Sequence, residues 1–196
     1  MLVERINTEV QITPAMPDAA SQLNGAHLKR WLLLSLLVLL LDQATKWLIL
    51  STLQPFEPVI LSPNLNLTLM FNEGAAFSFL SDAGGWQRWL FTGLALTVSV
   101  VLTVWLLRLK RGEGWLAAGL ALLIGGAIGN LIDRILLGHV VDFIQVSLPF
   151  IPLDLFNPWP AFNIADSAIT LGVIILLIAT LIADDTANRS PSENGV

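Results

Sequence analysis

Four long apolar segments dominate the pattern of hydrophobic and polar positions along the chain, at about residues 31–50, 86–107, 115–137 and 162–183. Each has close to the roughly 20 residues that an α-helix needs to cross the hydrocarbon core of a bilayer. In the first segment the apolar residues resume after Asp42 and no small-x-small site follows, which argues against a cleaved secretory signal. The pattern therefore predicts four membrane-spanning helices.

The residues between the first two segments follow a different period. Apolar residues occupy every second position, at Leu65, Leu67, Leu69 and Phe71. A period of two indicates a β-strand with one apolar face. We therefore expect a small β-sheet within about residues 51–85, lying on the membrane surface.

Positive charges set the expected orientation of the chain. Lys29 and Arg30 precede the first span, and Arg108, Lys110 and Arg111 lie between the second and the third. By the positive-inside rule these residues are cytoplasmic, which places both termini in the cytoplasm and the sheet outside. The predicted fold class is an all-α membrane protein with four transmembrane helices and a small extracytoplasmic β-sheet on the membrane surface.

The two ends of the chain differ from its middle. Residues 1–28 are polar and aperiodic and contain two prolines, and residues 184–196 are short, polar and acidic. We expect the first to be a disordered cytoplasmic tail and the second a cytoplasmic tail as well. Residues 29–183 then form a single membrane domain.

Composition excludes several functions. Of the 196 residues, 55% are hydrophobic and only 13% are charged, which is unlike a soluble domain. The net charge of −5, with scattered Lys and Arg, argues against a nucleic-acid partner. The chain has no cysteine and two histidines, so a zinc ion would depend mainly on carboxylates, an unusual ligand set. We expect no metal and no cofactor.

Polar side chains within the apolar segments are the first candidates for a functional site. Asp or Arg at the centre of a membrane helix costs about 2.5–3.5 kcal/mol on insertion scales, so such residues are functional candidates by default. The third and fourth segments carry Asn130, Asp133, Arg134, Asn163 and Asp166, and Asp142 follows just past the third. Asp42 and Lys46 are one turn apart in the first segment and can pair. That pair is either purely structural or part of a site.

Helical spacing and topology bring these residues together. Asn130, Asp133 and Arg134 share one stripe of their helix, and Asn163 and Asp166 share another. The C-terminal end of the third span and the N-terminal end of the fourth both lie on the outer side, so we expect the carboxyls of Asp142 and Asp166 to meet there.

Two adjacent carboxylates cannot easily both ionise, so one keeps a proton near neutral pH. Such a pair can activate a water molecule and polarise a carbonyl, as in aspartic proteases. A small transporter or channel, with Asp42, Asp133, Arg134 and Asp166 as a proton or ion relay, is the alternative, and a purely structural membrane subunit is a third. The charges cluster toward one face, without an evident internal repeat, which favours the peptidase.

Four motifs together resemble the bacterial lipoprotein signal peptidases, also called signal peptidase II: LDQATKW at 41–47, FNEGAAFSFL at 71–80, GNLIDRILLGHVVDF at 129–143 and FNIADSAIT at 162–170. They occur in that family's order across nearly all of residues 30–183. The resemblance implies an intramembrane aspartyl endopeptidase that removes the signal peptide from prolipoproteins, cleaving before a diacylglyceryl-modified cysteine. It also implies the bacterial cytoplasmic (inner) membrane, with the active site at the outer (periplasmic) face.

The resemblance implies roles for single residues. Asp142 in VVDF and Asp166 in NIAD match the catalytic pair, and the remaining matches are pocket residues (Asn72, Asn130, Arg134 and Asn163) and supporting polar residues (Asp42 and Asp133). The implied partners are a lipid-modified prolipoprotein and membrane lipids, and one chain carries a complete site, which favours a monomer. The chain departs from the family's pattern in its polar extension before about residue 28 and in the Pro-rich residues 147–160.

Overall fold

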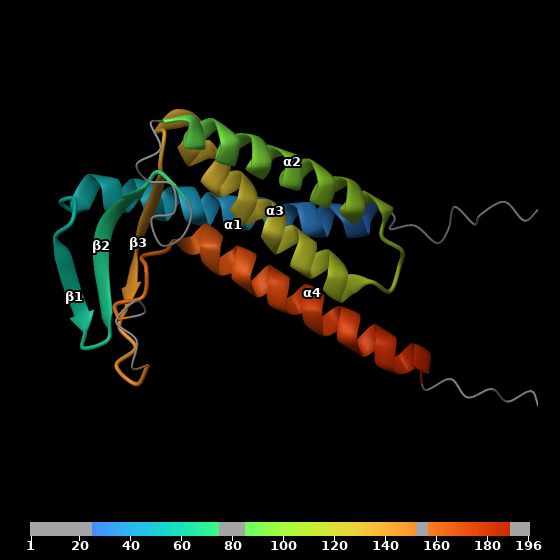
Figure 1. Cartoon of the computed structure of the whole chain (residues 1–196). Helices are drawn as coiled ribbons and strands as arrows, with labels where there is room; N and C mark the ends of the chain where they lie inside the picture. The colour runs from blue at the N-terminus through green and yellow to red at the C-terminus, as the bar shows by residue number, and fades with distance from the viewer. Residues whose placement is uncertain (1–24, 75–84, 152–156, 189–196) are drawn as a thin grey trace, which may run out of the picture.

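A computed structural model of the chain describes residues 25–74, 85–151 and 157–188. In chain order its elements are α1 (Gly25–Thr52), β1 (Pro58–Ser62), β2 (Leu65–Asn72), α2 (Trp86–Arg108), α3 (Gly114–Leu136), β3 (Val140–Val146) and α4 (Ile164–Asn188) (Figure 1). Within the described residues, all four helices are long and apolar enough to cross a membrane. The predicted fold class is therefore confirmed.

The first and last helices, α1 and α4, are longer than the apolar segments predicted. Helix α1 begins at Gly25, so residues 25–28 are helical although they were expected in the tail, and α4 continues to Asn188. Polar residues such as Lys, Arg and His are compatible with a helix, and apolar periodicity therefore underestimates helix length at polar ends. The predictions for residues 1–24 and 189–196 lie outside the described residues.

Helix α3 is the centre of the bundle and packs against each of the other three helices (Figure 1). Its glycines permit the close approach. An ideal Cβ at Gly125 would lie 2.6 Å from the carbonyl oxygen of Ser35 on α1, and one at Gly126 would lie 2.5 Å from that of Ala165 on α4. Side chains at these positions would push the helices apart, so α3 is the central helix because it is rich in glycine.

The sheet is antiparallel with strand order β1-β2-β3, and its third strand was not predicted. Strand β3 pairs with β2 so that Met70 lies opposite Asp142. Its sequence, VVDFIQV, lacks the strict alternation of a half-buried strand, because its first four residues are all buried. An alternating pattern identifies only strands that have one solvent-exposed face. The first four residues of β3 have no such face, so the pattern does not reveal this strand.

The sheet lies at one end of the helical bundle, and α1 begins and α4 ends at the other (Figure 1). Ile49 of α1, Leu69 of β2, and Val141 and Phe143 of β3 form a buried apolar cluster that joins the sheet to the bundle. The pairing of β2 with β3 is irregular between Leu67 and Met70. Residues 75–84, which the sequence also assigned to the region of the sheet, lie outside the described part of the chain.

Candidate active site

Asp166 lies in the first turn of α4, and the residue before that helix holds it in place. The backbone N–H of Asp166 donates to Asn163 Oδ1 at 2.9 Å, and the backbone N–H of Asn163 donates to Asp166 Oδ2 at 3.2 Å. This reciprocal pair of hydrogen bonds is a capping box, in which each side chain satisfies an N–H group left free at the helix start. The cap therefore fixes the carboxyl of Asp166 relative to the backbone.

Asn163 also links Asp166 to Asp142, the two carboxyls that the sequence predicts to lie together. Its Nδ2 donates to Asp142 Oδ1 at 2.7 Å. The other oxygens of the pair have donors of their own: Asn72 Nδ2 donates to Asp142 Oδ2 at 3.0 Å, and Asn130 Nδ2 donates to Asp166 Oδ1 at 2.7 Å. Elements β2, β3, α3 and α4 thus each contribute to one hydrogen-bonded group around the two carboxyls.

Burial makes Asp142 a group that can exchange a proton near neutral pH. Desolvation raises its pKa to about 7, and the nearby carboxyl of Asp166 acts in the same direction. The hydrogen bonds from Asn72 and Asn163 and the charge of Lys46 lower the same pKa, but by less. A carboxyl with this pKa can serve as acid or as base at physiological pH.

A buried ion cluster lies behind the two carboxyls. Lys46 Nζ lies 2.8 Å from Asp42 Oδ2 and 2.8 Å from Asp133 Oδ2, and all three side chains are almost fully buried. Asp42 accepts the backbone N–H of Ala165 at 2.9 Å, and Asp133 accepts that of Val141 at 3.1 Å. Each carboxylate therefore holds the residue that immediately precedes one member of the Asp142–Asp166 pair.

Arg134 borders the same site with part of its guanidinium unused. Its Nη1 donates weakly to the carbonyl of Asn130 at 3.4 Å, and its Cζ lies 5.6 Å from the ring centroid of Phe91. Its Nε is buried and has no hydrogen-bond partner among the described residues. A buried donor without a partner is costly, so this N–H is an unsatisfied group at the edge of the site.

A cavity of about 1270 Å³ opens over the two carboxyls. Five of the eight predicted site residues line it, namely Asn72, Asn130, Arg134, Asp142 and Asp166. The other three, Asn163, Asp42 and Asp133, are buried behind it. Apolar side chains of α4, including Leu171 and Ile174, continue its wall along the helix. The cavity thus joins a polar end, where the carboxyls lie, to an apolar flank.

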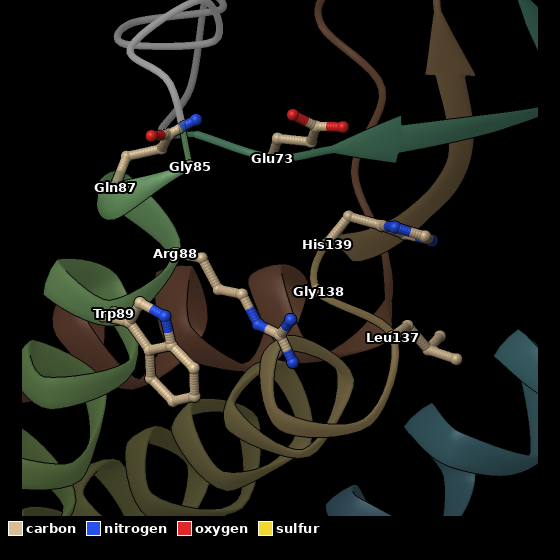
Figure 2. A pocket seen from close by; sticks show the side chains of 8 residues that line it. All are labelled: Glu73, Gly85, Gln87, Arg88, Trp89, Leu137, Gly138 and His139. Carbon is tan, nitrogen blue, oxygen red and sulfur yellow. The ribbon is translucent and has the colours of Figure 1, made fainter.

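A second, smaller cavity of about 280 Å³ lies between the start of α2 and the loop that precedes β3 (Figure 2). Arg88 points from α2 toward Gly138 (Figure 2) and donates to the carbonyls of Arg134 and Ile135 at 2.9 and 2.8 Å. It therefore caps the C-terminal end of α3. The ring of His139 packs against that of Phe71 in a tilted arrangement, with 4.5 Å between ring centroids, and burial lowers the pKa of His139.

Sequence reasoning placed Lys46 in an ion pair but did not include it, or Gln43, among the site residues. Gln43 Nε2 donates to Asp133 Oδ1 at 3.0 Å, and Lys46 Nζ donates to Asn130 Oδ1 at 2.9 Å. The available signal was the i, i+4 spacing of Asp42 and Lys46 in an apolar helix, but spacing gives no partner on another helix. Among the described residues, no three His, Cys, Asp or Glu side chains are grouped as a metal ion would require.

The fold and the site define a membrane-embedded protein in which two carboxyls, linked through hydrogen bonds to Asn163, lie at one end of a four-helix bundle. The family model described as signal peptidase (SPase) II matches residues 34–182, which is most of the chain. This chain therefore belongs to the signal peptidase II family and is a peptidase.

Known relatives of this chain resemble it both in amino-acid sequence and in structure. The chain is 55% identical to the lipoprotein signal peptidase of Pseudomonas fluorescens over 166 residues, covering 83% of this chain and 92% of the relative. It is 56% identical to that of Acinetobacter baumannii over 150 residues, covering 76% and 82%. A solved bacterial membrane enzyme, 31% identical, matches with a TM-score of 0.72 over 90% of this chain and 98% of its own.

Proposed function

We propose that this chain removes the signal peptide from prolipoproteins as an intramembrane aspartyl endopeptidase, with Asp142 and Asp166 as the catalytic pair and cleavage before the diacylglyceryl-modified cysteine. One observation carries the assignment of the pair: Asn163 hydrogen-bonds to both carboxyls, which face a large cavity. Two carboxyls held together beside a cavity are the arrangement that activates water for attack on a peptide carbonyl.

The two carboxyls divide the chemistry between them. The ionised one takes a proton from water as the water oxygen attacks the scissile carbonyl carbon, while the protonated one donates a hydrogen bond to the carbonyl oxygen. The C–N bond of the tetrahedral intermediate then breaks, and a proton passes to the leaving amine of the cysteine. A pKa of about 7 for Asp142 supports this exchange, since the group is available in both protonation states.

Asn72 and Arg134 are proposed to hold the substrate around the scissile bond. Both line the large cavity, and the guanidinium of Arg134 carries several N–H groups that can donate to a substrate carbonyl. The apolar flank formed by Leu171 and Ile174 suits the lipid-modified part of the precursor, which stays in the bilayer. Asn130 and Asn163 orient the carboxyls, and Asp42 and Asp133 support them from behind.

The chain is a protein of the bacterial inner membrane, and we infer its orientation from its charges. The start of α1 and the connection between α2 and α3 lie at the end of the bundle opposite the sheet (Figure 1). The first contains Lys29 and Arg30, and the second contains the basic residues at 108–111. The positive-inside rule then places both termini in the cytoplasm and the active site at the outer face. We infer that the exposed apolar side chains of the helices contact membrane lipids. The monomer is the functional unit because one chain supplies every site residue.

The proposal is tested by replacing each carboxyl with its amide. Asp142→Asn and Asp166→Asn should each lower the rate of cleavage of a lipidated precursor by about 10²–10⁴-fold, the usual contribution of one acid or base. Glu57→Gln is a matched control, since Glu57 is exposed on the same side of the molecule and does not line the cavity. The measurement is the turnover rate of purified protein at equal amounts of folded enzyme.

Near wild-type turnover by either amide variant would reject the assignment of the pair. The transporter or channel alternative gains no support, because in the described part of the chain the buried ion pairs Lys46–Asp42 and Lys46–Asp133 form a single cluster. The result that would favour the transporter or channel is a proton flux into liposomes containing the protein, if Asp166→Asn abolishes that flux.

A further inference from the structure

Lys46 is the buried cation of the ion cluster behind the site, and its hydrogen-bonding capacity is fully used. Its ammonium group has three hydrogens. Three acceptors surround it: Asp42 Oδ2 at 2.8 Å, Asp133 Oδ2 at 2.8 Å and Asn130 Oδ1 at 2.9 Å. The first two contacts are ion pairs, and a single carboxylate would already balance the charge of the ammonium group. The third reaches a neutral side chain that itself contacts Asp166, and it therefore calls for another explanation.

An ammonium group only donates hydrogen bonds, so it determines which way the amide of Asn130 points. The atom of Asn130 nearest Lys46 must be its oxygen, and Asn163 Nδ2 donates to the same oxygen at 3.1 Å. The NH₂ group is then on the other side, where it donates to Asp166 Oδ1 at 2.7 Å. A flipped amide would place NH₂ against the ammonium and oxygen against the carboxyl, two repulsive contacts.

We propose that Lys46 is a positioning residue of the carboxyl pair: it holds Asn130 in the amide orientation that donates a hydrogen bond to Asp166. Lys46 does not touch either member of the pair. Its charge also acts on Asp142 directly, but its hydrogen bonds reach Asp166 only through one intermediate side chain, that of Asn130. This inference rests on the proposed function, because it assigns Asp166 to the chemistry. A purely structural ion pair would stabilise the helices equally well but would not depend on Asn130.

The test must remove the lysine without leaving two unpaired carboxylates in the interior. The double variant Asp42→Asn/Lys46→Met removes one charge of each sign, and Asp42→Asn alone is its matched control. Asparagine keeps an oxygen for the N–H of Ala165, which Asp42 accepts at 2.9 Å. We expect kcat for a lipidated precursor to fall about 10- to 100-fold below the control, the value of a hydrogen bond to a charged group, with KM changed by less than about threefold.

A double-mutant cycle separates positioning from stability. With Asn130→Ala present in both proteins, Lys46→Met should cost less than about threefold in kcat, because the side chain through which Lys46 acts is gone. The same loss with and without Asn130, or an unchanged kcat in Asp42→Asn/Lys46→Met, would overturn the proposal.

A second set of variants applies if the double variant does not fold. Adding Asp133→Asn gives a cluster with no charge, in which no buried ion is left unpaired. In this background Asn130→Ala should change kcat by less than about threefold, whereas a loss as large as in the wild type would mean that Asn130 is oriented without Lys46. Asp142→Asn is measured alongside: if it stays active the proposed function fails, and if it is inactive while the coupling is absent only the inference about Lys46 fails.

Discussion

Helices α2 and α3 are the same length and are both apolar enough to cross a membrane, but they occupy opposite environments. Each spans 23 residues. Only 11% of the most apolar window of α2 is buried inside the protein, whereas 67% of that of α3 is buried. Apolar content therefore identifies a membrane span without identifying the helix around which the bundle is built.

The residues that distinguish the two helices are the small and the polar ones. The hydroxyls of Thr97 and Thr103 in α2 donate to carbonyls of their own helix, and an added Cβ at Gly93 would meet open space. In α3, Gly126 contacts α4 and Asp133 pairs with α1. Lipid removes the hydrophobic drive between helices, so close packing and polar contacts decide which helices associate.

Among the substitutions that test this difference between α2 and α3, Asp133→Leu should have the largest effect on stability. Asp133→Leu leaves the N–H of Val141 without its acceptor and removes one partner of Lys46, so the free energy of unfolding should fall by about 3 kcal/mol. Thr103→Val in α2 is the isosteric control and should cost at most about 0.5 kcal/mol, because its hydroxyl bonds within its own helix. Unfolding of the purified proteins in detergent measures both, and equal losses would contradict the comparison.

A smaller effect is expected from adding one methyl group to each helix. Gly126→Ala places a Cβ 2.5 Å from the carbonyl oxygen of Ala165, so α3 and α4 must separate, at a cost of about 1–3 kcal/mol. Gly93→Ala adds the same group to α2 in open space and should be neutral or slightly stabilising. A Gly126→Ala protein as stable as Gly93→Ala would show that the two helices do not pack as closely as described.

The smallest effect is a pH dependence from Asp142, which lies outside the spans. Because burial raises its pKa to about 7, the folded state keeps a proton that the unfolded state has lost. Stability from this group is therefore complete at low pH and is lost as pH rises through about 7. Between pH 6 and 8 the wild type should lose on the order of 1 kcal/mol that Asp142→Asn keeps. Equal pH slopes for the two proteins would refute this.

The polar residues of the predicted site could be singled out individually from the sequence. Asn130, Arg134 and Asp166 are polar groups in apolar segments, and the cost of burying them is high enough to identify them without a structure. All eight predicted site residues line the large cavity or lie directly behind it. The i, i+4 spacing of Asp42 and Lys46 likewise predicted their ion pair.

The amino-acid sequence by itself determined the four spans and the polar residues within them, because both follow from the free energy of placing each side chain in lipid. Tertiary structure alone decided that residues 140–146 form the third strand, with Asp142 opposite Met70, and that Lys46 turns the amide of Asn130 toward Asp166. These contacts join residues 36 to 84 positions apart. Local periodicity carries no information about them, since they arise only when separate helices and strands pack together.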